Sequence, residues 1–155
     1  MVDYSRLFHT GVRVPDLDAA MHELGASLGL TWAQPQHRTQ GLWTPERGAH
    51  TVDLRFTYSC EGPVHIELLQ GEPGTFWDGT QQPGAHHLGV WSDDIAAETQ
   101  AMVDGGWRLV GAGSPPDDGY GIYTYVAPPS GLIVELVSAV AMPMFDRWWA
   151  GGPLG

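Results

Sequence analysis

The chain has 155 residues, a length that suits one domain with a core of useful size. Its 18 acidic and 7 basic residues give a formal net charge of −11, which argues against nucleic acid or an anionic membrane surface as a partner. All seven basic residues are arginine, which excludes Schiff-base chemistry on lysine, and the single Cys60 excludes an intrachain disulfide and a cysteine-built zinc site. We expect a cytoplasmic protein, because no apolar run is long enough for a bilayer and the first residues lack a signal-peptide pattern.

In chain order, the first predicted elements are a strand over about residues 6–14 and a helix over 16–28. Asp16 is the expected N-cap, and apolar residues recur along the helix at intervals of three and four. These apolar residues are Leu17, Ala20, Met21, Leu24 and Leu28. Three strands follow, with a wide Pro/Gly-rich loop between the first two, and lie near residues 29–34, 50–59 and 63–70.

The same order of elements recurs after residues 71–84, a stretch rich in Gly, Pro and Gln that we interpret as a linker. The second set is a strand near 86–92, a helix over 94–104, and strands near 107–112, 120–127 and 130–138. We therefore predict a single domain over 1–155, made of module one (about 6–70), the linker, module two (about 85–138) and a tail (139–155). The tail is aromatic, with Phe145, Trp148 and Trp149, and is expected to pack on the domain or on a partner subunit.

Two motifs show that the modules are repeats. Residues 8–16 and 86–94 both read x-His-x-Gly-Val-x-x-x-Asp, which aligns His9 with His87. Residues 64–69 and 132–137 are both apolar strands with one carboxylate, Glu67 in the first and Glu135 in the second. The sequence thus predicts βαβββ twice, with one imidazole and one carboxylate at equivalent strand positions in each copy.

The four repeated side chains suggest a metal site. An ionised carboxylate within an apolar strand costs several kcal/mol unless it is paired or bound to metal. Two-fold repetition would bring His9, Glu67, His87 and Glu135 together, and two neutral imidazoles with two carboxylates balance a divalent ion. We predict one divalent metal, Zn, Ni, Co, Mn or Fe, at these residues. Taken singly, such a His is more often a satisfied core residue and such a Glu is more often half-exposed.

These motifs resemble the vicinal-oxygen-chelate superfamily, which includes glyoxalase I, methylmalonyl-CoA epimerase, extradiol dioxygenases and the bleomycin-resistance proteins. The resemblance covers about residues 6–138. It rests on residues 8–12, 15–20, 64–68, 86–90 and 134–136. It implies an α+β fold, with tandem βαβββ modules forming a cupped mixed β-sheet around a metal, often in a homodimer. The family's four ligand positions fall on His9, Glu67, His87 and Glu135, while His86 is expected to point to the other face of its strand.

The resemblance also implies a chemistry, in which the metal binds a substrate oxygen and stabilises an enolate while a glutamate moves a proton on the carbon next to the carbonyl. We predict a metal-dependent isomerase, epimerase or lyase that acts on a small carbonyl compound or thioester. Glu135 is the expected base and Glu67 the partner acid or second base, with His65 tuning Glu67 from the same strand face. The candidate substrate-binding residues are Arg13, Trp91 and Tyr123, for which a surface ion pair and core packing are the ordinary alternatives.

Two other functions stay open. An extradiol-type dioxygenase would use Fe(II) with two His and one Glu, which leaves Glu67 without a role. A metal-free small-molecule-binding protein of the drug-resistance kind would need an aromatic pocket. Residues that can supply one are Trp32, Trp43, Trp77, Trp91, Tyr120 and Tyr123. The epimerase-like branch usually carries Gln at the position of Glu67, so that the His-Glu-His-Glu set is nearer to the glyoxalase I pattern.

Overall fold

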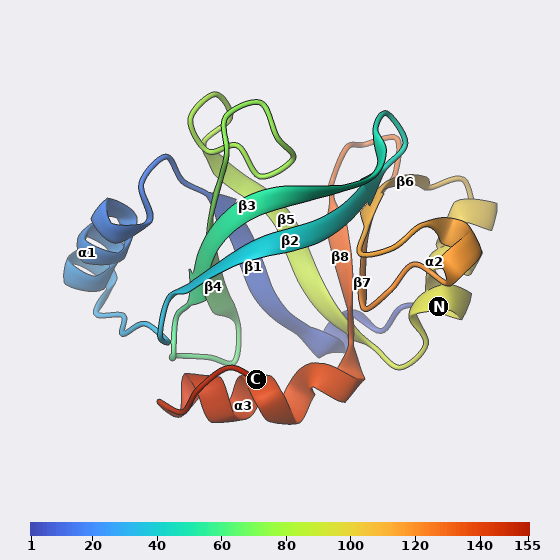
Figure 1. Cartoon of the computed structure of the whole chain (residues 1–155). Helices are drawn as coiled ribbons and strands as arrows, with labels where there is room; N and C mark the ends of the chain where they lie inside the picture. The colour runs from blue at the N-terminus through green and yellow to red at the C-terminus, as the bar shows by residue number, and fades with distance from the viewer. The chain divides into compact units, whose positions relative to one another are not determined.

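The computed structural model describes residues 1–155 and divides the chain into two compact units. We call them the N-unit, with residues 8–40, 52–86 and 142–155, and the C-unit, with residues 1–7, 41–51 and 87–141. Each unit contains most of one predicted module, and Figure 1 labels their helices and strands. The hydrogen-bonded order of the strands is β1-β4-β3-β2-β6-β7-β8-β5. None of the helices has the length and hydropathy required to span a membrane.

The N-unit pairs β1 with β4 and covers β4 with a helix. β1 (Leu7–Arg13) runs parallel to β4 (His65–Gly71), and β3 (Gly48–Tyr58) runs antiparallel to β4 on its other side. The helix α1 (Leu17–Leu28) contacts β4. It begins at Asp16, whose Oδ1 accepts from the Ala19 N–H at 3.0 Å, and ends at Gly29, whose φ of 69° suits a residue without a side chain.

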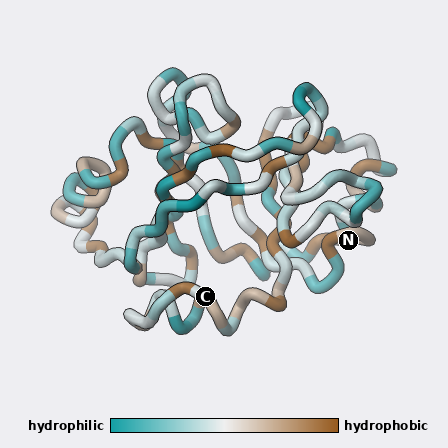
Figure 2. The backbone as a smooth tube through the Cα atoms, viewed as in Figure 1, coloured by the Kyte–Doolittle hydropathy of each residue, from teal (hydrophilic) through white to brown (hydrophobic).

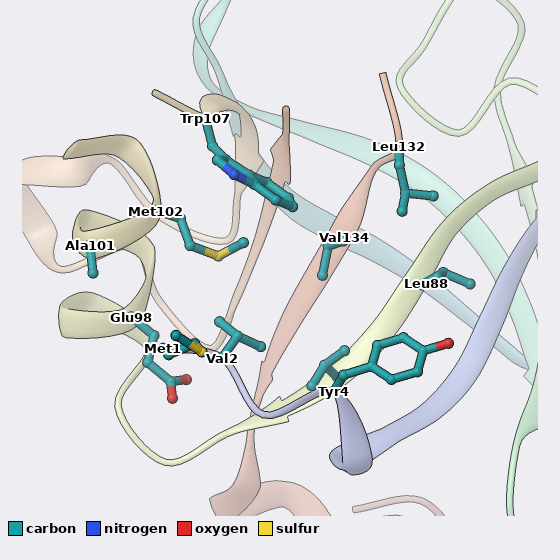
Figure 3. Close-up of a pocket in the computed structure, with 11 residues that line it drawn as sticks. Met1, Val2, Tyr4, Leu88, Glu98, Ala101, Met102, Trp107, Leu132 and Val134 are labelled. Carbon is teal, nitrogen blue, oxygen red and sulfur yellow. The ribbon is translucent and has the colours of Figure 1, made fainter. Parts of the chain in front are cut away.

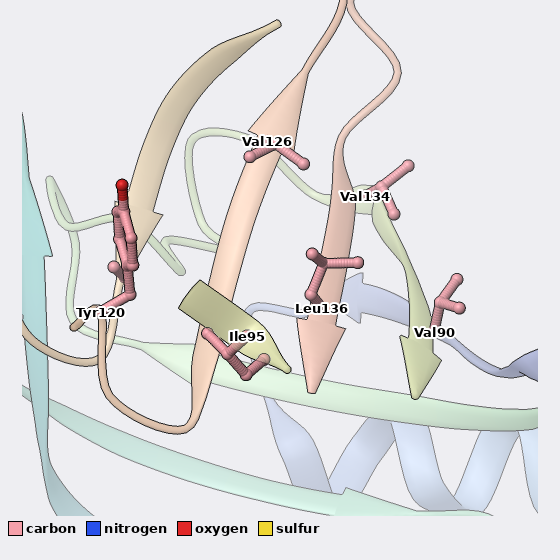
Figure 4. Close-up of a cluster of buried hydrophobic side chains, with 7 residues drawn as sticks. Val90, Ile95, Tyr120, Val126, Val134 and Leu136 are labelled. Atoms are coloured by element: carbon pink, nitrogen blue, oxygen red, sulfur yellow. The ribbon is translucent and has the colours of Figure 1, made fainter. Parts of the chain in front are cut away.

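The C-unit repeats this arrangement. β5 (Gly84–Ser92) runs parallel to β8 (Val134–Ser138), and β7 (Tyr123–Ala127) pairs antiparallel with β8 and with β6 (Arg108–Ala112). The helix α2 (Ile95–Asp104) is capped by Asp94 and packs on β6, β7 and β8. The buried side chains between α2 and this sheet form one hydrophobic cluster, shown in Figure 4. They are Val90, Ile95, Ala112, Tyr120, Val126, Val134 and Leu136.

The prediction of a strand near 29–34, followed by a wide loop, is wrong. The strand is β2 (Gln36–Thr44), while Trp32 forms only an isolated bridge with Ser59. The first residues of β2 are hydrophilic and largely exposed, and hydrophobic positions appear only toward its end, as Figure 2 shows. Because strand prediction depends on apolar alternation, this polar strand resembles a loop in sequence. A cross-strand contact between His37 Nε2 and Asp53 Oδ1, at 2.9 Å, links β2 to β3.

The aromatic tail is part of the N-unit. After a short 3-10 helix at Ala139–Ala141, the chain forms α3 (Met142–Trp149). The Trp148 side chain is fully buried, and its Nε1–H donates to the Gln34 carbonyl at 3.0 Å. Its ring packs edge-on against Phe56 and Tyr58, with centroids 5.8 and 5.6 Å away. The tail therefore contributes a core residue to this unit.

Candidate metal centre

In the N-unit, β1 and β4 bring His9 and Glu67 together. The His9 Nε2 lies 3.2 Å from the Glu67 Oε2, and the residues are 0% and 7% exposed. In the parallel register Gly11 stands opposite Glu67. Since a side chain at that position would lie beside Glu67 on the same face, the glycine leaves space next to the carboxylate.

In the C-unit, β5 and β8 form the same arrangement with His87 and Glu135. The His87 Nε2 lies 3.2 Å from the Glu135 Oε2, and the residues are 3% and 6% exposed. Gly89 stands opposite Glu135, as Gly11 stands opposite Glu67. The two modules thus carry equivalent buried pairs, each of one imidazole and one carboxylate.

The donor set fits a divalent transition metal. His9, Glu67, His87 and Glu135 are the residue types that bind Zn and its neighbours through nitrogen and oxygen. All four are buried, and an isolated buried carboxylate is costly unless a cation or hydrogen bonds compensate it. Within each unit the structure brings together one predicted His and one predicted Glu.

Sequence reasoning missed a tyrosine beside each pair. Tyr58 on β3 stands opposite Glu67, and its ring contacts the His9 ring edge-on at 5.2 Å. Tyr125 on β7 stands opposite Glu135, and its ring contacts the His87 ring edge-on at 5.1 Å. Both tyrosines are buried. The signal was available in the sequence, because each tyrosine follows a threonine in the strand that precedes the glutamate strand.

His65 lies opposite His9 in the β1–β4 register and is held by contacts other than Glu67. Its Nδ1 lies 2.7 Å from the Ser59 carbonyl, to which it donates, and its ring stacks on Trp149 with a centroid distance of 3.7 Å. Burial lowers the pKa of this imidazole, the hydrogen bond to Ser59 opposes that shift, and the nearby His9 lowers it further. His65 thus connects the β1–β4 pair to α3.

The predicted substrate-binding residues lie in different surroundings. The Arg13 Nη1 donates to the Phe76 carbonyl at 3.3 Å and to the Gln82 Oε1 at 3.0 Å, so the guanidinium faces the loop over 72–83. Burial lowers the pKa of Arg13, and the carboxylate of Asp78 opposes that shift. Trp91 occupies the position on β5 that Arg13 occupies on β1, and it is buried.

The remaining residues named from the sequence, Tyr123 and His86, each contact a neighbour outside the His–Glu pairs. The buried Tyr123 donates its hydroxyl to the Gly41 carbonyl within the C-unit. His86 packs edge-on against Phe76 at 5.0 Å, in agreement with the expectation that it points away from the face of His87.

The glyoxalase/bleomycin resistance protein/dioxygenase superfamily model matches residues 8–125 of the chain. Among curated proteins, an ethylmalonyl-CoA/methylmalonyl-CoA epimerase of Cereibacter sphaeroides is 27% identical over 135 residues, which are 84% of this chain and 96% of that protein. An uncharacterized protein of Bacillus subtilis is 30% identical over 94 residues, 60% of this chain and 65% of that protein.

Solved structures show the same fold. A methylmalonyl-CoA epimerase of Streptomyces coelicolor, in complex with 2-nitronate-propionyl-CoA, superposes with a TM-score of 0.60 at 21% identity, over 88% of this chain and 95% of that chain. The methylmalonyl-CoA epimerase of Mycobacterium tuberculosis gives a TM-score of 0.59 at 18% identity, over 89% of this chain and 92% of that chain. The predicted α+β fold of tandem βαβββ modules is thereby confirmed.

Proposed function

Because the chain belongs to the glyoxalase/bleomycin resistance protein/dioxygenase superfamily, also called the vicinal-oxygen-chelate superfamily, we propose that it is a metal-dependent epimerase. Its substrate would be a CoA thioester with an acidic C–H next to the carbonyl, the substrate class in the name of the curated epimerase relative. The observation that carries the proposal is the repeated buried pair of His and Glu, with nitrogen and oxygen 3.2 Å apart in each unit.

We assign one divalent metal to His9, Glu67, His87 and Glu135. The two carboxylates carry two negative charges in buried strands, and a divalent cation is the simplest group that neutralises both. When bound, such a metal supplies a Lewis acid that polarises the substrate carbonyl. The fit rests on the chemistry of the donors and on their equivalent positions in two modules.

The two glutamates supply the proton transfer. Epimerisation breaks the C–H bond next to the carbonyl and forms a new C–H bond on the opposite face of that carbon. In our proposal Glu135, as a carboxylate, takes the proton from one face, and Glu67, which takes up a proton from solvent for this step, donates that proton to the opposite face. Each module supplies one glutamate beside one histidine, which matches a reaction that needs one proton carrier for each face of the carbon.

Neighbouring residues position the imidazole and the carboxylate of each pair. The Tyr58 and Tyr125 rings pack on the two imidazoles, which restricts the rotation of His9 and His87. Gly11 and Gly89 leave space beside the two carboxylates, where larger side chains would intrude. Both features are positioning roles, since neither tyrosine ring has to touch substrate for this effect.

The proposal is tested by metal content and by proton exchange. We expect about one equivalent of a transition metal by mass spectrometry in the native protein, and substantially less in His87→Ala and His9→Ala. The exposed His22 on α1 offers a matched control, and His22→Ala should keep the metal. With methylmalonyl-CoA in D₂O, the native protein should exchange the proton next to the carbonyl, and Glu135→Gln should lose activity by on the order of 10²–10⁴.

The outcomes separate the candidate functions. A protein that takes up no metal on titration would refute the enzyme and indicate the metal-free binding function instead. Bound Fe(II), with ring cleavage of a catechol and no proton exchange, would indicate the oxygenase. Glu23→Gln on α1 controls for loss of surface charge, because Glu23 is exposed and should leave exchange unchanged. The homodimer stays a prediction, which analytical ultracentrifugation tests.

A further inference from the structure

The C-unit contains a cavity on the face of β5 and β8 that points away from its metal-ligand candidates, His87 and Glu135. We call it the outer pocket; its volume is about 390 Å³. Leu88 and Val134 line it, and each is the chain neighbour of a candidate ligand, His87 or Glu135. Because successive side chains on a strand point to opposite faces, the outer pocket is separate from the proposed metal site.

Three parts of the C-unit wall the outer pocket, as Figure 3 shows. The sheet contributes Leu88 and Val134, α2 and the turn after it contribute Met102 and Trp107, and the first residues of the chain contribute Val2 and Tyr4. The lining is almost entirely apolar.

The N-terminal wall is held in place by polar contacts. The Asp3 Oδ1 accepts from the Ser5 N–H at 2.9 Å and caps the short 3-10 helix Tyr4–Arg6. Arg6 Nη1 then forms an ion pair with Asp93 Oδ2 at 2.6 Å. These contacts order the segment against the C-unit, so that the pocket is formed before a ligand arrives.

The internal repeat places related side chains at the equivalent positions of the N-unit. In the N-unit, Val12 and Ile66 occupy the positions equivalent to Val90 and Val134, and Trp32 packs directly on the cluster between α1 and β4. The Trp32 Nε1–H donates to the Met21 carbonyl at 2.9 Å, which fixes the indole in that position. In the C-unit Trp107 follows α2 as Trp32 follows α1; it packs against the C-unit cluster and also lines the outer pocket.

The outer pocket carries one charged side chain, and its charge is negative. Glu98 lines the pocket, and the Ser92 hydroxyl donates to its carboxylate. The cations nearby are Arg6, which is already paired with Asp93, and the α-amino group of Met1, a residue that also lines the pocket. The pocket volume corresponds to about a dozen water molecules, at the lower end of small-molecule sites.

We propose that the outer pocket binds a small amphiphile with an apolar body and a cationic amine. The apolar walls remove the body from water, and the amine lies against Glu98, which attracts a cation and repels an anion. The formal net charge of −11 acts in the same direction. The proposal does not depend on the reaction at the metal site.

The test uses three probes with one hydrocarbon body, namely octylamine, octanol and octanoate, with binding measured by saturation-transfer NMR and calorimetry. We expect octylamine to bind about tenfold tighter than octanol, and octanoate to bind weakest. Glu98→Gln should remove the preference for the amine, whereas Glu23→Gln on α1 should preserve it. His87→Ala should retain octylamine binding, which separates this site from metal coordination.

A second variant pair tests the location. Leu132 lies at the rim and is 51% exposed, and Val64 is its equivalent in module one at 46% exposed. Leu132→Ala should weaken all three probes by about threefold, and Val64→Ala should leave them unchanged, without loss of folding in either case. Equal binding of amine and carboxylate, unchanged binding in both Glu98→Gln and Leu132→Ala, or no binding at millimolar probe would overturn the proposal.

Discussion

Replacing Trp148 by alanine tests whether the C-terminal helix is part of the N-unit core. A tryptophan buries roughly 150–250 Å² of surface, which at about 25 cal/mol per Å² stabilises the fold by about 4–6 kcal/mol as an upper estimate. Measured Trp→Ala substitutions in cores cost about 3–5 kcal/mol. The whole of this contribution is lost on substitution, because the Trp148 side chain is 0% exposed. The Gln34 carbonyl also loses its hydrogen-bond donor. We expect Trp148→Ala to lower the free energy of unfolding by about 4 kcal/mol.

Thermal and urea unfolding monitored by circular dichroism measure this effect. For a domain of this size the loss corresponds to a fall in Tm of roughly 8–16 °C. Tyr4→Ala is an aromatic control, because Tyr4 is 69% exposed and its loss should change stability by less than about 0.5 kcal/mol. If Trp148→Ala cannot be purified folded, Trp148→Phe gives a smaller loss in the same direction. A Tm that stays within 2 °C of the native value in both Trp148→Ala and Trp148→Phe would refute the packing of α3 against Phe56 and Tyr58.

Three further predictions concern packing and polar contacts away from the metal-ligand candidates. Gly79→Ala should destabilise the chain by about 1–3 kcal/mol in urea unfolding, because a Cβ at Gly79 would lie 2.1 Å from the Val14 carbonyl oxygen. Asp78→Asn should lower Tm at neutral pH. The hydrogen bonds that the Asp78 carboxylate accepts from backbone N–H groups, that of Gly74 first, hold its pKa below the ordinary 3.8. The stability that this carboxylate contributes is present above its unfolded pKa and is lost as pH falls through its folded pKa. Thr99→Val and Thr124→Val should each cost about 1–3 kcal/mol, and the double variant less than their sum, because their buried hydroxyls bond to each other at 2.8 Å.

Each of these predictions has a contradicting result. Gly41→Ala is the control for Gly79, since a Cβ there meets nothing closer than 3.8 Å, and equal losses in the two variants would contradict the packing argument. The Tm values of native protein and Asp78→Asn should converge below about pH 4, and a difference that persists in acid would contradict the assigned pKa direction. Strict additivity of the two threonine variants would contradict the hydrogen bond between them.

The helices and most strands could be predicted because their signals are local. Asp16 and Asp94 each accept a hydrogen bond from a backbone N–H three residues later, as N-cap residues do. The strand β2 has no such local signal, because most of its side chains are polar and exposed. It forms because it pairs with β3, and the apolar alternation of its own sequence is too weak to predict it. The loop over 72–83 was interpreted as a linker from its composition. In the structure it holds the buried Trp77 and Asp78, which composition alone does not reveal.

The candidate ligands could be found because a repeat turns four ambiguous residues into two equal pairs. The tyrosines were missed because an aromatic residue in a strand is ordinary, and their contact with His9 and His87 depends on strand order. The surroundings of Arg13 could not be predicted either. Its partners, Phe76 and Gln82, lie in a loop more than sixty residues away in the sequence.

The two faces of each parallel strand pair carry different parts of the repeat. The face with the His–Glu pair repeats its glycine and its tyrosine in both modules. On the opposite face Trp32 packs on the hydrophobic cluster of the N-unit, and Trp107 packs on that of the C-unit and lines the outer pocket. Substitutions in the outer pocket and at the His–Glu pairs should therefore have separable effects, since the two faces of one strand touch different neighbours.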